Sequence, residues 1–275
     1  GSWNAQNLPK GEVFDVDVRS MIKAPAGYTF AIVDLSQIEP RVLHWLAGDT
    51  KMLEHICQCP DFYEAQARAM GLWSGDEPLR TDPKKRHLIK GLNLGLGYGM
   101  GAKKFASVAN IPSDEAERLT RLYRTKNPLV TKLWKDLEEV LRSTATSKEE
   151  KNAEIEMPSG RKMTYRNVSV DHGGLTAQIP RQGKFMRLGF WGGVVTENLV
   201  QATARDVFMD CCLRIEAQGF PVLMRIHDEV VCQVPAGDEG KRCLDAIVNI
   251  MSTAPDWAEG LPLSAEGSLS DVYKK

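Results

Sequence analysis

Two aspartates, Asp34 and Asp228, stand where the local sequence pattern changes and could act together. Asp34 directly follows the apolar residues 30–33, and Asp228 lies between two further apolar runs. Carboxylates that converge from separate elements without a basic partner indicate a divalent-cation site, because Mg²⁺ prefers oxygen ligands and bridges carboxylates to substrate phosphates. Two such ions about 4 Å apart can activate an attacking oxygen and stabilise a leaving one. Aspartates at strand ends also form simple turns, so both interpretations stay open.

A second segment carries cations at a spacing that would suit a triphosphate. Residues 83–98 predict a helix that starts at Pro83, and Arg86 and Lys90 lie four positions apart, on one helix face. Guanidinium and ammonium groups bind phosphate oxygens well, although a basic helix face is also an ordinary solvated surface. The segment is rich in glycine, each costing up to about 1 kcal/mol against alanine. Either something approaches this backbone closely or the helix moves.

The elements that must position these side chains alternate between strands and helices. Strands are expected at residues 28–34, 221–226, 230–234 and 263–265, with a hairpin at 154–168. Helices are expected at residues 36–47, 83–98, 194–218 and 238–252, with shorter ones within 51–75 and 113–148. Ser36 followed by Glu39 fits a capping box, and Pro40 costs little in a first helical turn. This order predicts an α+β fold with antiparallel strands and helices on one face.

Composition excludes several classes of protein. The chain has 275 residues, is 43% hydrophobic and 26% charged, and carries 35 basic against 36 acidic residues. These values are typical of a globular domain, and the balanced charge indicates no particular partner. No run approaches the roughly 18 apolar residues of a membrane span, so no membrane partner is expected. The six cysteines lack the usual zinc spacing, which favours reduced thiols in an intracellular protein.

Six segments in order resemble motifs of the family A DNA polymerases. VDLSQIEPRVLHWLAGD resembles motif A, RHLIKGLNLGLGYG resembles motif B, and RIHDEVV resembles motif C. NAQNLP is similar to the segment before motif A, PSGRKMTY to the hairpin between motifs B and C, and ENLVQATARDVF to the helix before motif C. The matches run from residue 4 to about residue 268. The resemblance implies a DNA-directed DNA polymerase that adds deoxynucleotides to a primer 3′-hydroxyl, acting on primer–template DNA.

The resemblance also implies an architecture. Residues 1–49 and 153–275 would form the palm, an antiparallel sheet with helices on one face, and residues 50–152 an inserted, mainly helical fingers subdomain. The family's thumb and exonuclease lie upstream of the matched segments and are absent here. We therefore expect a palm-and-fingers portion: a separate chain supplies the rest, the enzyme is truncated, or the fragment works alone. The expected location is the cytoplasm of a bacterial or phage-infected cell.

The implied catalytic roles belong to four side chains and one carbonyl. Asp34 and Asp228 would hold two Mg²⁺ ions, for which Mn²⁺ can substitute, with help from the carbonyl of Leu35. Glu229 would support that site. Lys90 would act as general acid to the leaving pyrophosphate.

The implied substrate contacts lie in the same motifs. Glu39 would sit beneath the sugar near Tyr98, where a 2′-hydroxyl would clash, so the site would prefer deoxynucleotides. The full nucleotide-binding set is Gln37, Glu39, Arg86, Lys90, Leu94 and Tyr98. The implied DNA-binding residues are Gln6, Asn7, Arg41, Gln201 and His227.

Departures from the family pattern suggest a branch and leave alternatives. Leu94 stands where the family commonly has an aromatic residue, and Gly193 where bacterial members have arginine, which favours a phage or prophage branch. Without a thumb, the chain could instead be a non-catalytic module that binds DNA or protein. The single-subunit RNA polymerases are a third hypothesis, against which Glu39 argues.

Overall fold

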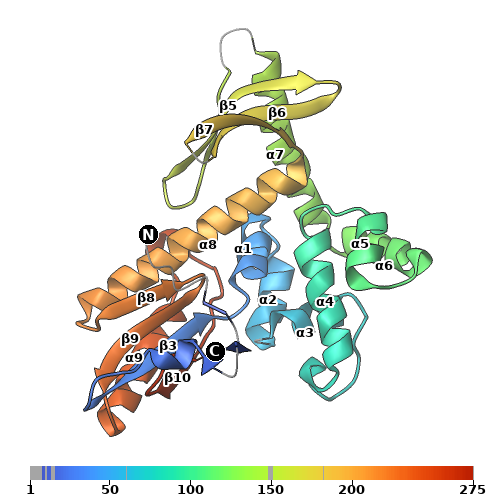
Figure 1. The fold of residues 1–275 in the computed structure, drawn as a ribbon. Coiled ribbons are helices and arrows are strands. Elements are labelled where there is room, and N and C mark those ends of the chain that lie inside the picture. Colours follow the sequence, from blue (N-terminus) through green and yellow to red (C-terminus); the bar gives the residue numbers. More distant parts are fainter. Residues whose placement is uncertain are drawn as a thin grey trace. The chain divides into compact units, whose positions relative to one another are not determined.

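The computed structural model describes residues 8–9, 11–13, 16–59, 61–147, 151–181 and 183–274, and the chain divides into two compact units (Figure 1). The first unit comprises the described residues up to Ile38 and those from Arg205 onward. The second comprises the described residues of Glu39–Ala204. Each unit has its own antiparallel sheet and its own apolar clusters.

The first unit is built on a four-stranded antiparallel sheet. Its order is β10 (Ala265–Ser270), β3 (Tyr28–Leu35), β9 (Glu229–Pro235) and β8 (Val222–Ile226). Helix α9 (Asp238–Met251) packs on one face of β3, β9 and β10. The opposite face of the sheet carries a separate apolar cluster that includes Phe30 and Ile32. Alternation along β3 therefore divides its side chains between two cores. The remaining short elements are β1 (Glu12–Val13), β2 (Val16–Asp17), η2 (Arg19–Met21) and η4 (Asp256–Ala258).

The second unit combines helices with a second sheet. The helices are α1 (Ile38–Leu46), whose first residue belongs to the first unit, α2 (Thr50–Gln58), α3 (Phe62–Ala69), α4 (Pro83–Leu96), α5 (Ala102–Ala109), α6 (Ser113–Lys126) and α7 (Pro128–Thr146), with a short η3 (Leu79–Thr81). The sheet has the order β4 (Ala153–Glu156), β5 (Lys162–Asp171), β6 (Gly174–Arg181) and β7 (Lys184–Phe190). Helix α7 packs on this sheet, and α8 (Gly192–Ala217) begins directly after it.

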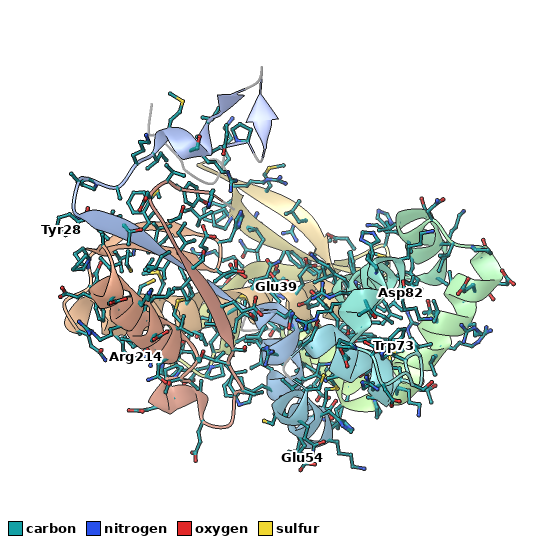
Figure 2. All side chains as sticks on the ribbon, turned by 90° about the horizontal axis from the view of Figure 1, so that it is seen from below. Tyr28, Glu39, Glu54, Trp73, Asp82 and Arg214 are labelled. Carbon is teal, nitrogen blue, oxygen red and sulfur yellow. The ribbon has the colours of Figure 1, made fainter. Side chains whose placement is uncertain are left out.

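The expected α+β class with antiparallel strands is confirmed, and most expected elements occur near their predicted bounds. Asp82, labelled in Figure 2, caps α4 by accepting the N–H of Lys85 at 2.9 Å, and Pro83 occupies the first helical position as predicted. Within the described residues, no helix has the length and apolarity that crossing a membrane requires.

Three expectations need correction. The predicted capping box of Ser36 and Glu39 is wrong. Gln37 adopts a left-handed φ of 51° and α1 begins only at Ile38, so Ser36 is not the residue directly before the helix. The last strand spans Ala265–Ser270 rather than residues 263–265. Strands β6 and β7 were not expected because alternation along them is weak, and helix α5 was not expected because it is only eight residues long.

Two glycines at the start of α8 allow backbone to approach backbone. A Cβ atom on Gly193 would lie 2.0 Å from the carbonyl oxygen of Tyr98, and one on Gly192 would lie 2.0 Å from the carbonyl oxygen of Trp134. Real Cβ atoms do not approach oxygen so closely, so any larger residue would force main-chain movement. This packing explains why glycine, not arginine, stands at position 193.

Replacement of Gly193 by alanine should therefore destabilise the protein. We expect a loss of about 1–3 kcal/mol in the free energy of unfolding, measured by urea titration. Gly91→Ala is the matched control, because a Cβ at Gly91 in α4 would meet nothing within 4 Å. That control should leave stability unchanged or raise it by up to about 1 kcal/mol. Equal stability of Gly193→Ala and the unmodified chain would contradict the packing argument.

Candidate active site

The pairing of β3 with β9 brings the acids of motifs A and C together in the first unit. Asp34 lies directly opposite Glu229 in the antiparallel register, and the N–H of Leu35 donates to the carbonyl oxygen of Asp228 at 3.1 Å. Asp34 continues the face of β3 that carries Phe30 and Ile32. The apolar row thus ends in a half-buried carboxylate. The structure therefore brings Asp34, Asp228 and Glu229 to one edge of the sheet, as expected.

Two tight backbone turns support this edge. Strands β8 and β9 are joined by His227 and Asp228 alone, and His227 has a φ of 56°. Gln37, just after β3, has a φ of 51°. Non-glycine residues with positive φ are uncommon and often mark functional sites. Asp34 and Glu229 therefore project from ordered strands and Asp228 from a two-residue turn, and none of the three lies in a long loop.

Glu229 is held in a buried polar network. Its side chain is 1% exposed, and its Oε1 accepts a hydrogen bond from the hydroxyl of Tyr273 at 2.9 Å. The guanidinium carbon of Arg19 lies 5.5 Å from the centre of the Tyr273 ring, and Arg19 also donates to the carbonyl oxygens of Leu8 and Pro9. This network ties segments from both ends of the described chain to the acid that follows Asp228.

The donors at this edge fit a magnesium ion. Asp34 and Asp228 supply carboxylate oxygens and Leu35 a backbone carbonyl, all of which are hard ligands suited to Mg²⁺. Among the described residues, no group of three or more histidine, cysteine or acidic side chains could hold a metal ion. Magnesium usually keeps several waters and takes substrate phosphates as ligands, so two carboxylates are a sufficient protein contribution.

In the second unit, helix α4 presents the predicted phosphate-binding face. Arg86, Lys90 and Leu94 follow one another at four-residue intervals. Lys90 is exposed, and Leu94 is 40% exposed. Arg86 donates to the carboxylate of Asp61 at 3.1 Å and lies 5.3 Å from the ring centre of Tyr63. The arginine is thus oriented by α3, while Lys90 is open to a ligand.

The partly buried Glu39 lies near the buried Tyr98 in the second unit. Burial is the largest cause of the raised pKa of Glu39. The nearby Glu197 raises that pKa further, and a hydrogen bond from Gln201 lowers it. Burial likewise raises the pKa of Tyr98, with Glu39 as a further cause. The buried hydroxyl of Tyr98 has no hydrogen-bond partner within the described part of the chain. A buried polar atom of this kind normally needs a partner, so a ligand could supply one.

The predicted DNA contacts differ in accessibility. Gln201 and His227 are exposed, whereas Arg41 is only 2% exposed and burial lowers its pKa. A DNA contact by Arg41 would therefore require a rearrangement. Gln6 and Asn7 lie outside the described residues.

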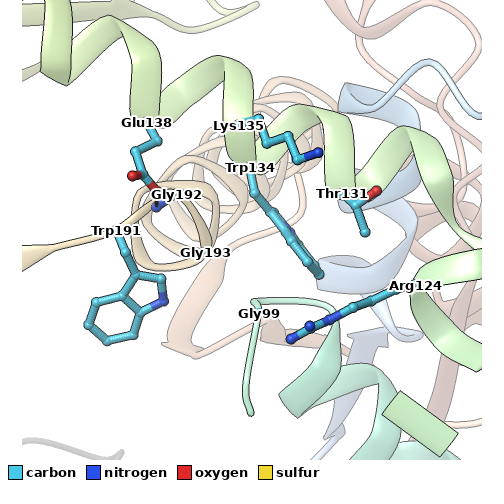
Figure 3. A pocket seen from close by; sticks show the side chains of 9 residues that line it. All are labelled: Gly99, Arg124, Thr131, Trp134, Lys135, Glu138, Trp191, Gly192 and Gly193. Carbon is cyan, nitrogen blue, oxygen red and sulfur yellow. Dashed lines mark hydrogen bonds between the residues drawn. The ribbon is translucent and has the colours of Figure 1, made fainter. Parts of the chain in front are cut away.

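A cavity of about 460 Å³ lies beside Tyr98 in the second unit (Figure 3). Its lining comprises Gly99, Arg124, Thr131, Trp134, Lys135, Glu138, Trp191, Gly192 and Gly193. Figure 3 shows Trp134 and Arg124 projecting toward the loop at Gly99. Indole rings beside cations suit a planar, anionic ligand. The sequence motifs did not indicate a role for Trp134 or Trp191. The sequence signal here is that Trp191 directly precedes Gly192 and Gly193.

Tyr273 was also missed from the sequence, and its hydroxyl should matter for stability. We expect Tyr273→Phe to lower the free energy of unfolding by about 1–3 kcal/mol, because a buried carboxylate loses a hydrogen bond. Tyr28→Phe is the control, since Tyr28 is 45% exposed (Figure 2). That control should change stability by at most about 0.5 kcal/mol. Identical urea-unfolding curves for the two variants would refute this role of the hydroxyl.

The raised pKa of Glu39 predicts a pH dependence. A carboxyl whose folded pKa exceeds its unfolded pKa prefers its protonated form in the folded state. Stability should therefore fall as the pH rises from the unfolded pKa of about 4.5 through the folded pKa. Glu39→Gln should remove this loss and raise the midpoint of thermal unfolding at pH 7. Glu54→Gln is the control, because Glu54 is exposed on α2, and it should leave the midpoint of thermal unfolding at pH 7 unchanged. A lower midpoint for Glu39→Gln would contradict the prediction.

Comparison with known proteins identifies the family. The sequence pattern of DNA polymerase family A matches residues 2–275. A DNA polymerase of Bacillus phage SP02 is 32% identical over 303 aligned residues, which include 100% of this chain and 46% of the phage protein. A thermostable DNA polymerase I of Thermus thermophilus is 26% identical over 276 aligned residues, which include 98% of this chain and 30% of that enzyme.

A solved structure shares the fold. The polymerase domain of Pol1 from M. smegmatis, in complex with DNA primer–template and dNTP, superposes with a TM-score of 0.70 at 20% identity, covering 98% of this chain and 44% of that one. The chain thus spans less than half the length of these relatives. Since the family pattern extends over nearly every residue, the chain belongs to DNA polymerase family A.

Proposed function

We propose that this chain catalyses DNA-templated addition of deoxynucleotides to a primer 3′-hydroxyl. The observation that carries the proposal is the register of β3 and β9, which sets Asp34 opposite Glu229 and joins Leu35 to Asp228. Membership of DNA polymerase family A supports it. The M. smegmatis relative was solved with primer–template DNA and dNTP, which supports these as the partners here.

In the proposed mechanism, Asp34, Asp228 and the carbonyl of Leu35 would hold two Mg²⁺ ions. These ions, or Mn²⁺ in their place, would lower the pKa of the primer hydroxyl and neutralise charge on the phosphates. The primer 3′-oxygen attacks the α-phosphorus, the bond to pyrophosphate breaks, and Lys90 donates a proton to the leaving group. Glu229 stays buried on its hydrogen bond to Tyr273 and keeps the edge of the sheet in place.

The nucleotide-binding role is proposed for residues of α4 and their neighbours. Lys90 and Arg86 would bind the triphosphate, with Leu94 beside the base and sugar. Glu39 and Tyr98 would receive the sugar, and the unpartnered hydroxyl of Tyr98 supports a ligand there. A ribose hydroxyl would meet this buried, acidic pair, so we propose selection of deoxynucleotides. Gln37 belongs to the turn after β3, where its left-handed backbone orients the start of α1.

The subdomain assignment is also a proposal. Residues 1–49 and 153–275 would act as the palm and residues 50–152 as the fingers. The compact units of the structure divide instead at residues 38/39 and 204/205, because β4–β7 belong with the helices of the second unit. Since the chain spans under half of its relatives, we propose that a separate or upstream segment supplies the duplex-gripping thumb.

A non-catalytic DNA- or protein-binding module is the second candidate. The exposed side chains of Gln201 and His227 could contact DNA without any catalysis, which favours it. A binder would not need converging carboxylates, which are costly to hold close together. The two functions differ in what the loss of Asp34 should do.

Primer extension with Mg²⁺ and dNTPs tests the proposal. We expect Asp34→Asn and Asp228→Asn each to lower the rate on the order of 10³-fold or more, because the ions lose a ligand. Asp238→Asn removes an exposed carboxylate of the same unit and should extend primers at the unmodified rate. Circular dichroism verifies that the variants fold. Unchanged extension by Asp34→Asn, or none by the unmodified folded chain with a thumb-bearing segment added, would favour the binding module.

A further inference from the structure

The sheet β5–β6–β7 presents a solvent-exposed face that the proposed catalysis does not use. Arg166 on β5 pairs with Gln178 on β6, and Gln178 pairs with Arg187 on β7. Directly opposite residues share a face, and alternate residues along a strand do too, so Phe185 joins them. The intervening Ala177 is buried in the core against α7. We call the face with Arg166, Gln178, Phe185 and Arg187 the outer face.

The outer face belongs to a basic segment of the chain. Residues 161–190 carry six basic side chains, Arg161, Lys162, Arg166, Arg181, Lys184 and Arg187, against one acidic side chain, Asp171, for a net charge of +5. The whole chain carries only −1, so this segment is far more positive than the sequence as a whole. Like charges gathered on one sheet raise the positive potential there.

The cations of the outer face are held in place and only partly neutralised. Arg187 donates to the hydroxyl oxygens of Ser169 at 2.8 Å and Thr176 at 2.9 Å, which orients its guanidinium on the outer face. Asp171 accepts hydrogen bonds from the same two hydroxyls and interacts electrostatically with Arg187, so it offsets part of that charge. The remaining positive charge is available to an anionic ligand.

An exposed aromatic ring lies among these cations. Phe185 is 57% exposed, although a phenylalanine gains from burial. The guanidinium carbon of Arg166 lies 5.5 Å from the centre of its ring. A phosphate backbone alone gains nothing from an exposed phenyl ring, whereas an unstacked base can stack on it. Cations beside an exposed ring on a flat sheet thus favour single-stranded nucleic acid over duplex.

We propose that the outer face of β5–β6–β7 binds single-stranded DNA, with Phe185 stacking on a base and Arg166 and Arg187 contacting phosphates. The choice of DNA rests on the proposed function, in which the unpaired template strand is the available single strand.

Fluorescence anisotropy of a labelled oligo-dT with the full chain tests the stacking. Phe185→Ala should weaken binding by about 5- to 150-fold, the range found for loss of one aromatic–base stack. Leu213→Ala is the control, because it removes a 64% exposed apolar side chain from the first unit, and it should leave affinity unchanged. Equal affinities of Phe185→Ala and the unmodified chain for oligo-dT would overturn the proposal. It would also be overturned if a blunt duplex bound as tightly as oligo-dT and Phe185→Ala weakened both equally.

A salt series tests the phosphate contacts. For the double variant Arg166→Gln/Arg187→Gln, the slope of log association constant against log salt should become shallower by about 1.4, since each lost single-strand contact accounts for about 0.7. Lys241→Gln removes one exposed charge on α9 and should keep the slope. An unchanged slope in the double variant would overturn the proposal.

The test separates this face from catalysis. Asp34→Asn should bind oligo-dT with unchanged affinity even where it fails to extend primers. If the unmodified chain extends no primer but Phe185→Ala still loses affinity, the binding face stands and the proposed catalysis fails. If extension succeeds while Phe185→Ala, like Leu213→Ala, binds normally, the binding face fails alone.

Discussion

The hydrogen-bonded ladder between β3 and β9 determines where every acid of the candidate site can lie. Side chains alternate across a strand, so a slip of one residue would turn Asp34 to the face that α9 covers and bring Val33 to the site. The apolar cluster under this face opposes such a slip, because Phe30 and Ile32 would both leave it. Ordinary core packing thus maintains the geometry on which the proposed metal chemistry depends.

Several parts of this arrangement could be predicted from sequence, because they are local. The strand before Asp34, the hairpin around Asp228 and the four-residue spacing of Arg86 and Lys90 follow from short-range patterns. The long-range partners could not be predicted. Tyr273 reaches Glu229 across 44 positions and Arg86 reaches Asp61 across 25, and neither pair shares a periodic signal.

The misses have physical causes too. Strands β6 and β7 were not expected because their outward residues mix polar, basic and apolar types and their inward apolar residues are few, so alternation is weak. The capping box failed because the backbone turns left-handed at Gln37, which a favourable pair of side chains cannot reveal. In both cases tertiary packing outweighed local preference.

The left-handed backbone at His227 has a consequence for the interpretation of related sequences. Only glycine, asparagine, aspartate and histidine adopt such a φ with some ease, so the turn restricts this position regardless of any ligand. Histidine at the corresponding position in a relative would therefore be weak evidence for contact with a primer. An asparagine there would preserve the turn and remove the imidazole, so natural variants of that kind would separate the demand of the backbone from that of the chemistry.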